Sequence, residues 1–175
     1  MNNLTDYIRV FDNVVSELSC ERIIQEYNSH NPSRYDTETY RFNQLNLNET
    51  DLKPLSAVFA RQLLPYYETY FKDLSLSEYV QLTNFEDIRI KRYAKGQDEF
   101  KTHVDIGDIV SAKRFAIAIL YLNENNGYTE FPTLNYKVKP ETGRLVIFPP
   151  TWMYPHRGIS PTDKDKYIMM TCLTY

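Results

Sequence analysis

The sequence is poor in the features that would tie a chain to a membrane, a secretory route or a disulfide scaffold. It has two cysteines, Cys20 and Cys172, and no C-x-x-C pair, so we expect two buried thiols in a reducing cytoplasm rather than a disulfide framework. The longest apolar run, residues 115–122, is too short to span a bilayer. The first residues have neither the basic nor the apolar segment of a signal peptide, which predicts a cytoplasmic location.

Positive charge is also scarce. The formal net charge of −3 gives no general reason to expect a nucleic acid or an anionic membrane as a partner. A basic group formed by Arg89, Lys91, Arg92 and Lys95 is expected to be the solvated face of a strand. The length of 175 residues predicts a single domain, residues 1–175, that can bury a proper core.

Tryptophan occurs once, whereas 15 tyrosines and nine phenylalanines favour strands. The spacing of apolar residues nevertheless predicts two helices in the first half of the chain. One covers about 17–29, with Ser16 or Ser19 as its N-cap. The other is capped by Asp51, and Pro65 is expected to kink or divide it. Its apolar stripe is expected to consist of Leu55, Val58, Phe59, Leu63 and Tyr66 or Tyr67.

Strands are expected elsewhere. One is predicted at 7–11, and residues 32–50 hold either a strand near 40–45 or a mobile flap. Alternation and turn residues then predict strands at 79–85, 88–93, 115–122, 129–131, 134–138, 144–148 and 167–175. Helices followed by seven or eight strands indicate the α+β class, with the sheets arranged as a sandwich or barrel.

Histidine is rare, with only three residues. His30 lies at the polar end of the first predicted helix, where a C-terminal histidine interacts favourably with the helix dipole. His103 and Asp105 are two residues apart, so in an extended segment their side chains leave the same face. His156 is the natural third ligand. Two histidines and one carboxylate on one face of a metal are typical of non-haem Fe(II) oxygenases, because this set leaves positions open for a cosubstrate and dioxygen.

The final predicted strand carries a lysine on an apolar face. Lys166 is in register with Ile168, Met170 and Cys172. Such a lysine either extends past the strand end into solvent or meets an anion inside the protein. A buried cation near a metal would suit the far end of a dicarboxylate cosubstrate.

From Ile88 onwards the chain resembles the prolyl 4-hydroxylase-like branch of the 2-oxoglutarate/Fe(II)-dependent dioxygenases. The matching pieces, in order, are Arg92-Tyr93-Ala94-Lys95-Gly96 with Phe100, His103-Val104-Asp105, Tyr121-Leu122-Asn123, Gly127-Tyr128-Thr129-Glu130-Phe131-Pro132, Val138-Lys139-Pro140 with Gly143, Phe148-Pro149, His156, and Lys166-Tyr167-Ile168. Residues 11–15, with Cys20 and the helix that follows, resemble that family's N-terminal segment less distinctively.

The resemblance implies a double-stranded β-helix, or jelly roll, over about 76–175 with helical support over about 12–75. It implies Fe(II) held by His103, Asp105 and His156, and 2-oxoglutarate whose distal carboxylate meets Lys166 and Tyr121. Tyr93 would line the cosubstrate pocket, while Thr129 and Phe148 would be wall and core. Dioxygen would be the co-reactant and ascorbate a candidate stimulant. The sequence departs from the family pattern at Asn126, where a glycine is usual, and at Met170 and Cys172, where relatives often carry threonine and tryptophan.

The resemblance leaves the substrate open. Peptidyl proline, another protein side chain and a small molecule all remain, and we expect a monomer or weak homodimer with no nucleic acid or membrane partner. Arg157, Trp152, Tyr154 and residues 34–47 are the candidates for facing a substrate. Two alternatives from other classes are a non-catalytic jelly-roll binding module and a metal-dependent hydrolase or isomerase. Neither would depend on 2-oxoglutarate.

Overall fold

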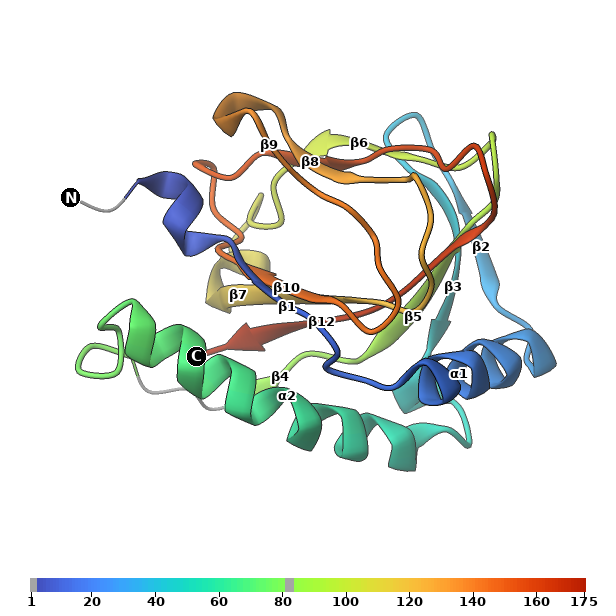
Figure 1. Cartoon of the computed structure of the whole chain (residues 1–175), viewed down its shortest axis with the longest axis horizontal. Helices are drawn as coiled ribbons and strands as arrows, with labels where there is room; N and C mark the ends of the chain where they lie inside the picture. Colours follow the sequence, from blue (N-terminus) through green and yellow to red (C-terminus); the bar gives the residue numbers. More distant parts are fainter. Residues whose placement is uncertain (1–2, 81–83) are drawn as a thin grey trace.

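The protein is built from two antiparallel sheets that face each other, with two helices on the outside of the larger one (Figure 1). The computed structural model describes residues 3–80 and 84–175. In this part of the chain the larger sheet has the order β1-β10-β7-β12-β5-β3-β2, with β4 paired to β12 as well. The smaller sheet has the order β6-β11-β8-β9.

The large sheet consists of β1 (Arg9–Phe11), β2 (Ser33–Asp36), β3 (Arg41–Asn46), β4 (Asn84–Phe85), β5 (Arg89–Tyr93), β7 (Arg114–Tyr121), β10 (Leu145–Phe148) and β12 (Lys166–Thr174). The small sheet consists of β6 (Phe100–His103), β8 (Thr129–Phe131), β9 (Tyr136–Val138) and β11 (His156–Gly158). The helices are α1 (Glu17–Ser29) and α2 (Lys53–Asp73), with single 3₁₀ turns at Leu4–Tyr7, Leu47–Glu49, Ser111–Lys113 and Pro132–Leu134.

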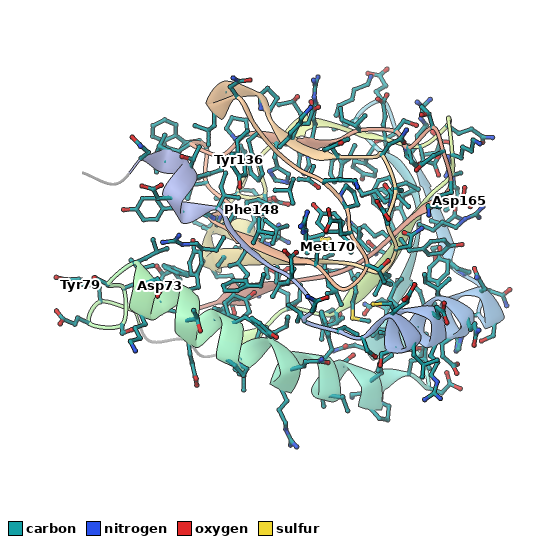
Figure 2. The ribbon with its side chains drawn as sticks, in the orientation of Figure 1. Asp73, Tyr79, Tyr136, Phe148, Asp165 and Met170 are labelled. Carbon is teal, nitrogen blue, oxygen red and sulfur yellow. The ribbon has the colours of Figure 1, made fainter. Side chains whose placement is uncertain are left out.

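Strand β7 divides the interior into two cores. Ala116, Ala118 and Leu120 face the helices, whereas Ile117 and Ile119 face the small sheet. This alternation follows from the two-residue period of a strand, and it confirms the strand predicted at 115–122, which is buried on both faces. Figure 2 shows Phe148 and Met170 in the space between the two sheets, where the second core lies.

Helix α2 covers the outer face of the large sheet through Phe59, Leu63 and Tyr67, as its spacing predicts. Val58 was wrongly included in the stripe, because its side chain is 61% exposed. Pro65 lies inside α2, which continues for two further turns, so the helix is not divided there.

One of the two predicted helix N-caps is confirmed and the other is wrong. Ser16 caps α1, since its side chain accepts a hydrogen bond from the backbone N–H of Ser19. The prediction that Asp51 caps α2 is wrong, because Leu52 is the N-cap residue. The Asp51 carboxylate instead lies 2.8 Å from Nε2 of His30, which ends α1 as predicted. A short-range pattern cannot distinguish a cap from a partner 21 residues away.

The strand predictions hold for most of the large sheet. The strand near 40–45 is β3, and the alternative of a mobile flap is wrong; β2, its hairpin partner, was not predicted. The prediction at 79–85 falls partly on residues 81–83, which lie outside the described residues, and β4 covers its last two positions. Strands β6 and β11 were also missed, and they carry His103 and His156.

Three strands of the large sheet come from the first 46 residues, so the expected helical support also contributes to the sheet. Cys20 and Cys172 are both buried free thiols, as predicted. In the described part of the chain, no helix combines the length and apolar character needed to cross a membrane.

Candidate metal centre and adjoining pocket

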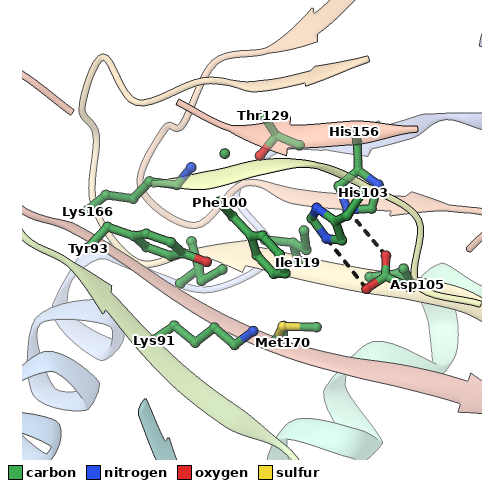
Figure 3. A pocket seen from close by; sticks show the side chains of 13 residues that line it. Lys91, Tyr93, Phe100, His103, Asp105, Ile119, Thr129, His156, Lys166 and Met170 are labelled. Carbon is green, nitrogen blue, oxygen red and sulfur yellow. Dashed lines mark ion pairs between the residues drawn. The ribbon is translucent and has the colours of Figure 1, made fainter. Parts of the chain in front are cut away.

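The three predicted ligands meet between the sheets. His103 and His156 are direct register partners of β6 and β11, with ring centroids 4.3 Å apart. Asp105 follows β6, and its backbone N–H donates to the carbonyl of Pro150. Its Oδ2 lies 3.2 Å from His156 Nε2, and its Oδ1 lies 3.8 Å from His103 Nε2 (Figure 3). One ligand atom from each residue lies within 4.8 Å of the others.

Hydrogen bonds fix which nitrogen of each imidazole faces the carboxylate. His103 Nδ1 lies 2.8 Å from the carbonyl oxygen of Lys101, and His156 Nδ1 lies 3.2 Å from that of Tyr154. Because a carbonyl only accepts, each Nδ1 carries the proton and donates it. Both Nε2 lone pairs are therefore directed at Asp105, which is the tautomer that metal-ligating histidines adopt.

The charges of the cluster fit a cation. Burial lowers the pKa of His103 to about 4 and also lowers the pKa of His156, so both rings are neutral at pH 7. Asp105 Oδ2 is buried, and no donor among the described residues reaches it. A buried carboxylate oxygen without a partner is costly, and a metal ion is the group that would satisfy it together with both Nε2 atoms.

Two residues that the sequence did not single out as supports hold this geometry. Arg114 Nη1 donates to the carbonyl of Asp105 at 2.7 Å, while its Nε and Nη2 donate to both carboxylate oxygens of Glu86. The Phe100 ring stacks on His103 with centroids 3.5 Å apart and planes 6° apart. Arg114 gives no sequence signal beyond its place at the start of an apolar strand, whereas Phe100 belongs to the family-like pieces.

Removing the Phe100 ring is expected to weaken metal binding, because His103 would lose the surface that fixes its orientation. We expect Phe100→Ala to raise the dissociation constant for Fe(II) by about tenfold, as for the loss of other groups that orient metal ligands. Anaerobic titration calorimetry measures this, with Phe100→Tyr as the control that keeps a ring. Equal affinities of the alanine variant and wild type would contradict the role.

A pocket extends from the three ligands to Lys166, which enters from the first residue of β12 (Figure 3). The lysine is 2% exposed, and its Nζ donates to the carbonyl of Gly127 at 2.6 Å. The rings of Tyr93 and Tyr121 lie 5.5 and 5.7 Å from Nζ. In the described part of the chain, no carboxylate lies within ion-pair distance of it. Of the two alternatives, the lysine therefore points inside, and burial lowers its pKa to about 7.

The other predicted cosubstrate residues lie at different depths. Tyr93, the register partner of Lys166, lines the pocket. Tyr121 is fully buried behind Thr129, to whose hydroxyl its Oη donates at 2.7 Å, and Thr129 lines the pocket. Thr129 therefore lines the same pocket as Lys166, and Tyr121 holds the Thr129 hydroxyl from behind.

Lys91 is not part of a solvated strand face, so that interpretation is wrong for this residue. Its side chain is 8% exposed and lines the same pocket, with Nζ 4.3 Å above the Phe42 ring and 5.6 Å from the Phe100 ring. Burial lowers its pKa to about 8. The signal was present in the sequence, because Lys91 alternates with Arg92 and shares a strand face with Tyr93.

The hairpin β2–β3 is fixed beside the pocket by an ion pair between the exposed Arg34 and the buried Asp98. Asp98 is fully buried; its oxygens accept two hydrogen bonds of 2.9 Å from the Arg34 guanidinium, and the backbone N–H of Ala94 donates to it as well. Although burial raises the pKa of Asp98, these hydrogen bonds lower it overall.

Asp98→Asn is expected to lower the free energy of unfolding by about 1–3 kcal/mol at pH 7, since the buried side chain loses the charge that strengthens its hydrogen bonds with Arg34 and the backbone N–H of Ala94. Because the pKa of Asp98 is lower in the folded state, the stabilisation is present above the unfolded pKa of about 4 and is lost as the pH falls through the folded value. Urea unfolding at pH 7 and pH 3 measures both effects. Asp36→Asn, at the exposed acid that also contacts Arg34, is the control.

The comparisons with known proteins agree with this geometry. The model of the 2OG-Fe(II) oxygenase superfamily matches residues 88–173, which include the three clustered residues and Lys166. The "Putative prolyl 4-hydroxylase" of Acanthamoeba polyphaga mimivirus is 24% identical over 178 residues, covering 91% of this chain and 70% of that protein.

Two solved structures share the fold. The viral collagen prolyl hydroxylase of Paramecium Bursaria Chlorella virus-1, in its 2OG complex, gives a TM-score of 0.69 at 21% identity, covering 98% of both chains. A prolyl hydroxylase from Trichoplax adhaerens, in complex with a hypoxia inducible factor peptide fragment, gives 0.70 at 16% identity, covering 97% of this chain and 84% of that one. The predicted α+β class and jelly roll are confirmed.

Proposed function

We propose that the chain is a 2-oxoglutarate/Fe(II)-dependent hydroxylase whose iron is held by His103, Asp105 and His156, since residues 88–173 match the model of the 2OG-Fe(II) oxygenase superfamily. The observation that carries the assignment of ligands is the unpartnered Oδ2 of Asp105 facing two Nε2 lone pairs. Three ligands on one side leave the other positions for cosubstrate and dioxygen.

In this proposal Lys166 forms a salt bridge with the distal carboxylate of 2-oxoglutarate. A buried ammonium without an acidic partner in the described chain is unfavourable until an anion arrives, so the carboxylate gains a strong charge-assisted contact. The hydroxyl pair Tyr121 and Thr129 completes that end of the site, and Tyr93 forms its wall.

When bound, iron and 2-oxoglutarate would supply an oxidation by dioxygen: one oxygen atom would enter succinate as 2-oxoglutarate loses carbon dioxide, and the other would become the hydroxyl group on the substrate. The residues of the chain do the rest. Lys101 and Tyr154 carbonyls hold the protons on Nδ1, Arg114 fixes the backbone of Asp105, and the apolar side chains of Ile117, Ile119 and Ile168 limit water in the pocket.

The substrate class is proposed by analogy. The viral relative is a collagen prolyl hydroxylase, and the Trichoplax adhaerens relative is seen with a peptide fragment. We therefore place peptidyl proline first and keep a small molecule or another protein side chain as the alternative. The chain would act as one domain, residues 1–175, as a monomer or weak homodimer, and its two buried free thiols suit a cytoplasmic location.

Anaerobic titration of Fe(II)-loaded protein with 2-oxoglutarate tests the proposal. A visible charge-transfer band should appear in wild type and be lost in His103→Ala. His30→Ala, at the helix-end histidine outside the pocket, should keep the band. Iron that binds without producing a band would overturn the oxygenase and favour the binding module or the hydrolase.

A further inference from the structure

A second groove opens on the Asp105 side of the candidate metal centre. It has a volume of about 240 Å³ and shares Lys91, Phe100, Asp105 and Met170 with the cosubstrate pocket, but Lys166 does not line it. A molecule in this groove would therefore reach Asp105 from a different side than a ligand held by Lys166.

One wall of the groove is aromatic. Tyr35, Tyr40 and Phe42 come from the hairpin β2–β3, and the Phe42 ring lies between the other two, with centroids 5.4 and 5.3 Å away. Phe42 also lies 6.0 Å from Phe100, which stacks on His103. A ring or an aliphatic group could pack along this row up to Phe100, beside the candidate metal centre.

Three basic residues line the groove, and in the described chain only the two arginines among them pair with an acidic side chain. Arg114 is bound by both oxygens of Glu86, and Arg89 lies 3.7 Å from the same carboxylate. Lys91 is 8% exposed, and within residues 3–80 and 84–175 no acidic side chain forms an ion pair with it. Its ammonium contacts the faces of Phe42 and Phe100 instead.

Lys91 is placed to contact something other than the distal carboxylate of 2-oxoglutarate. Its register partner on β12 is Ile168, whereas Lys166 pairs with Tyr93, so the two lysines are one step of a strand face apart, about 7 Å along the sheet. Figure 3 shows the two ammonium groups on separate sides of the pocket, with Lys91 beside Met170 and Phe100.

A buried ammonium that faces a groove is unfavourable unless an anion arrives there. We propose that Lys91 is a specificity-determining residue that binds a carboxylate of the substrate, next to the carbon that is hydroxylated, while the neutral part of the substrate packs on the aromatic row. This inference rests on the proposed function and narrows its substrate class. The carboxylate has two sources, an acidic side chain of a peptide or the free α-carboxylate of an amino acid.

Binding to the iron- and 2-oxoglutarate-loaded protein under argon tests the inference without turnover. Two matched pairs of probes separate the sources: N-acetyl-Pro-Glu-amide against N-acetyl-Pro-Gln-amide, and L-proline against L-prolinamide. Calorimetry should show about tenfold or tighter binding of the carboxylate member of at least one pair. That preference should disappear in Lys91→Met, which keeps the length of the side chain, and persist in Lys95→Met, an exposed lysine on the following turn.

The outcomes distinguish a failure of the Lys91 assignment from a failure of the proposed function. Loss of the preference in Lys91→Met, with unchanged 2-oxoglutarate affinity, supports the inference. Equal binding within both pairs, no binding of any probe, or a preference that survives in Lys91→Met would overturn it. If Lys91→Met lowers the affinity for 2-oxoglutarate but leaves the preference within the probe pairs unchanged, Lys91 contacts the cosubstrate. That result would also overturn the inference. Failure of the proposed function is seen earlier, as absence of the charge-transfer band in wild type.

Discussion

Replacing Lys166 with methionine is expected to raise the 2-oxoglutarate concentration that half-saturates the Fe(II)-loaded protein by about 100-fold, because removing one partner of a buried charge pair costs several kcal/mol. The charge-transfer titration measures this directly. Lys164→Met, at an exposed lysine two residues earlier, is the matched control and should titrate like wild type. If Lys166→Met binds 2-oxoglutarate with the affinity of wild type, the assignment of Lys166 to the cosubstrate site is contradicted.

The same substitution is expected to stabilise the ligand-free protein. Burial lowers the pKa of Lys166 from 10.5 to about 7, so between these pH values the unfolded chain binds more protons than the folded one. The free energy of unfolding of wild type therefore rises with pH across this window, and below pH 7 the full cost of the buried charge is present. Lys166→Met should unfold at a higher temperature at pH 7 and show a smaller rise towards pH 10. A lower unfolding temperature would mean that the protein itself satisfies the ammonium.

Replacing His156 with alanine is expected to abolish iron retention and to lower 2-oxoglutarate turnover by about 1,000-fold or more. A metal ion contributes several kcal/mol to such chemistry, and each 1.36 kcal/mol changes the rate tenfold. His156 is buried and supplies one of the two Nε2 lone pairs, so no other described histidine can replace it. Iron content after desalting and succinate formation are the measurements.

Retention of iron and turnover in His156→Ala would contradict the assignment of ligands. His30→Ala is the control, since His30 lies at the end of α1 and pairs with Asp51. Unfolding curves of both variants should be compared, because a loss of iron in a variant that still unfolds cooperatively reports on the ligand rather than on the fold.

The parts of the site that could be predicted from the sequence are those with a short-range signal. His103 and Asp105 share a face because they are two residues apart, and Lys166 lies on the inner face of β12 because of the two-residue period. Ser16 caps α1 through contacts within one turn. The order and spacing of the family-like pieces then indicated which distant histidine completes the cluster.

The parts that could not be predicted depend on contacts between distant segments. Strands β6 and β11 have three or four residues each and no clear alternation, and they become strands because they pair with each other. The local sequence around Asp51 is typical of a helix N-cap, but in the folded chain its carboxylate pairs with His30, 21 residues earlier.

The sequence alone therefore predicted His103 and Asp105 as a pair, the two helices and the inward face of the last strand, since spacing and periodicity act within a few residues. The tertiary structure alone decided the protonated nitrogens, the support from Arg114 and Phe100, and the burial of Lys91. The physical reason is that solvent exposure and hydrogen-bond partners are set by which sheets face each other, and a lysine has the same local pattern whether its strand face is covered or bare.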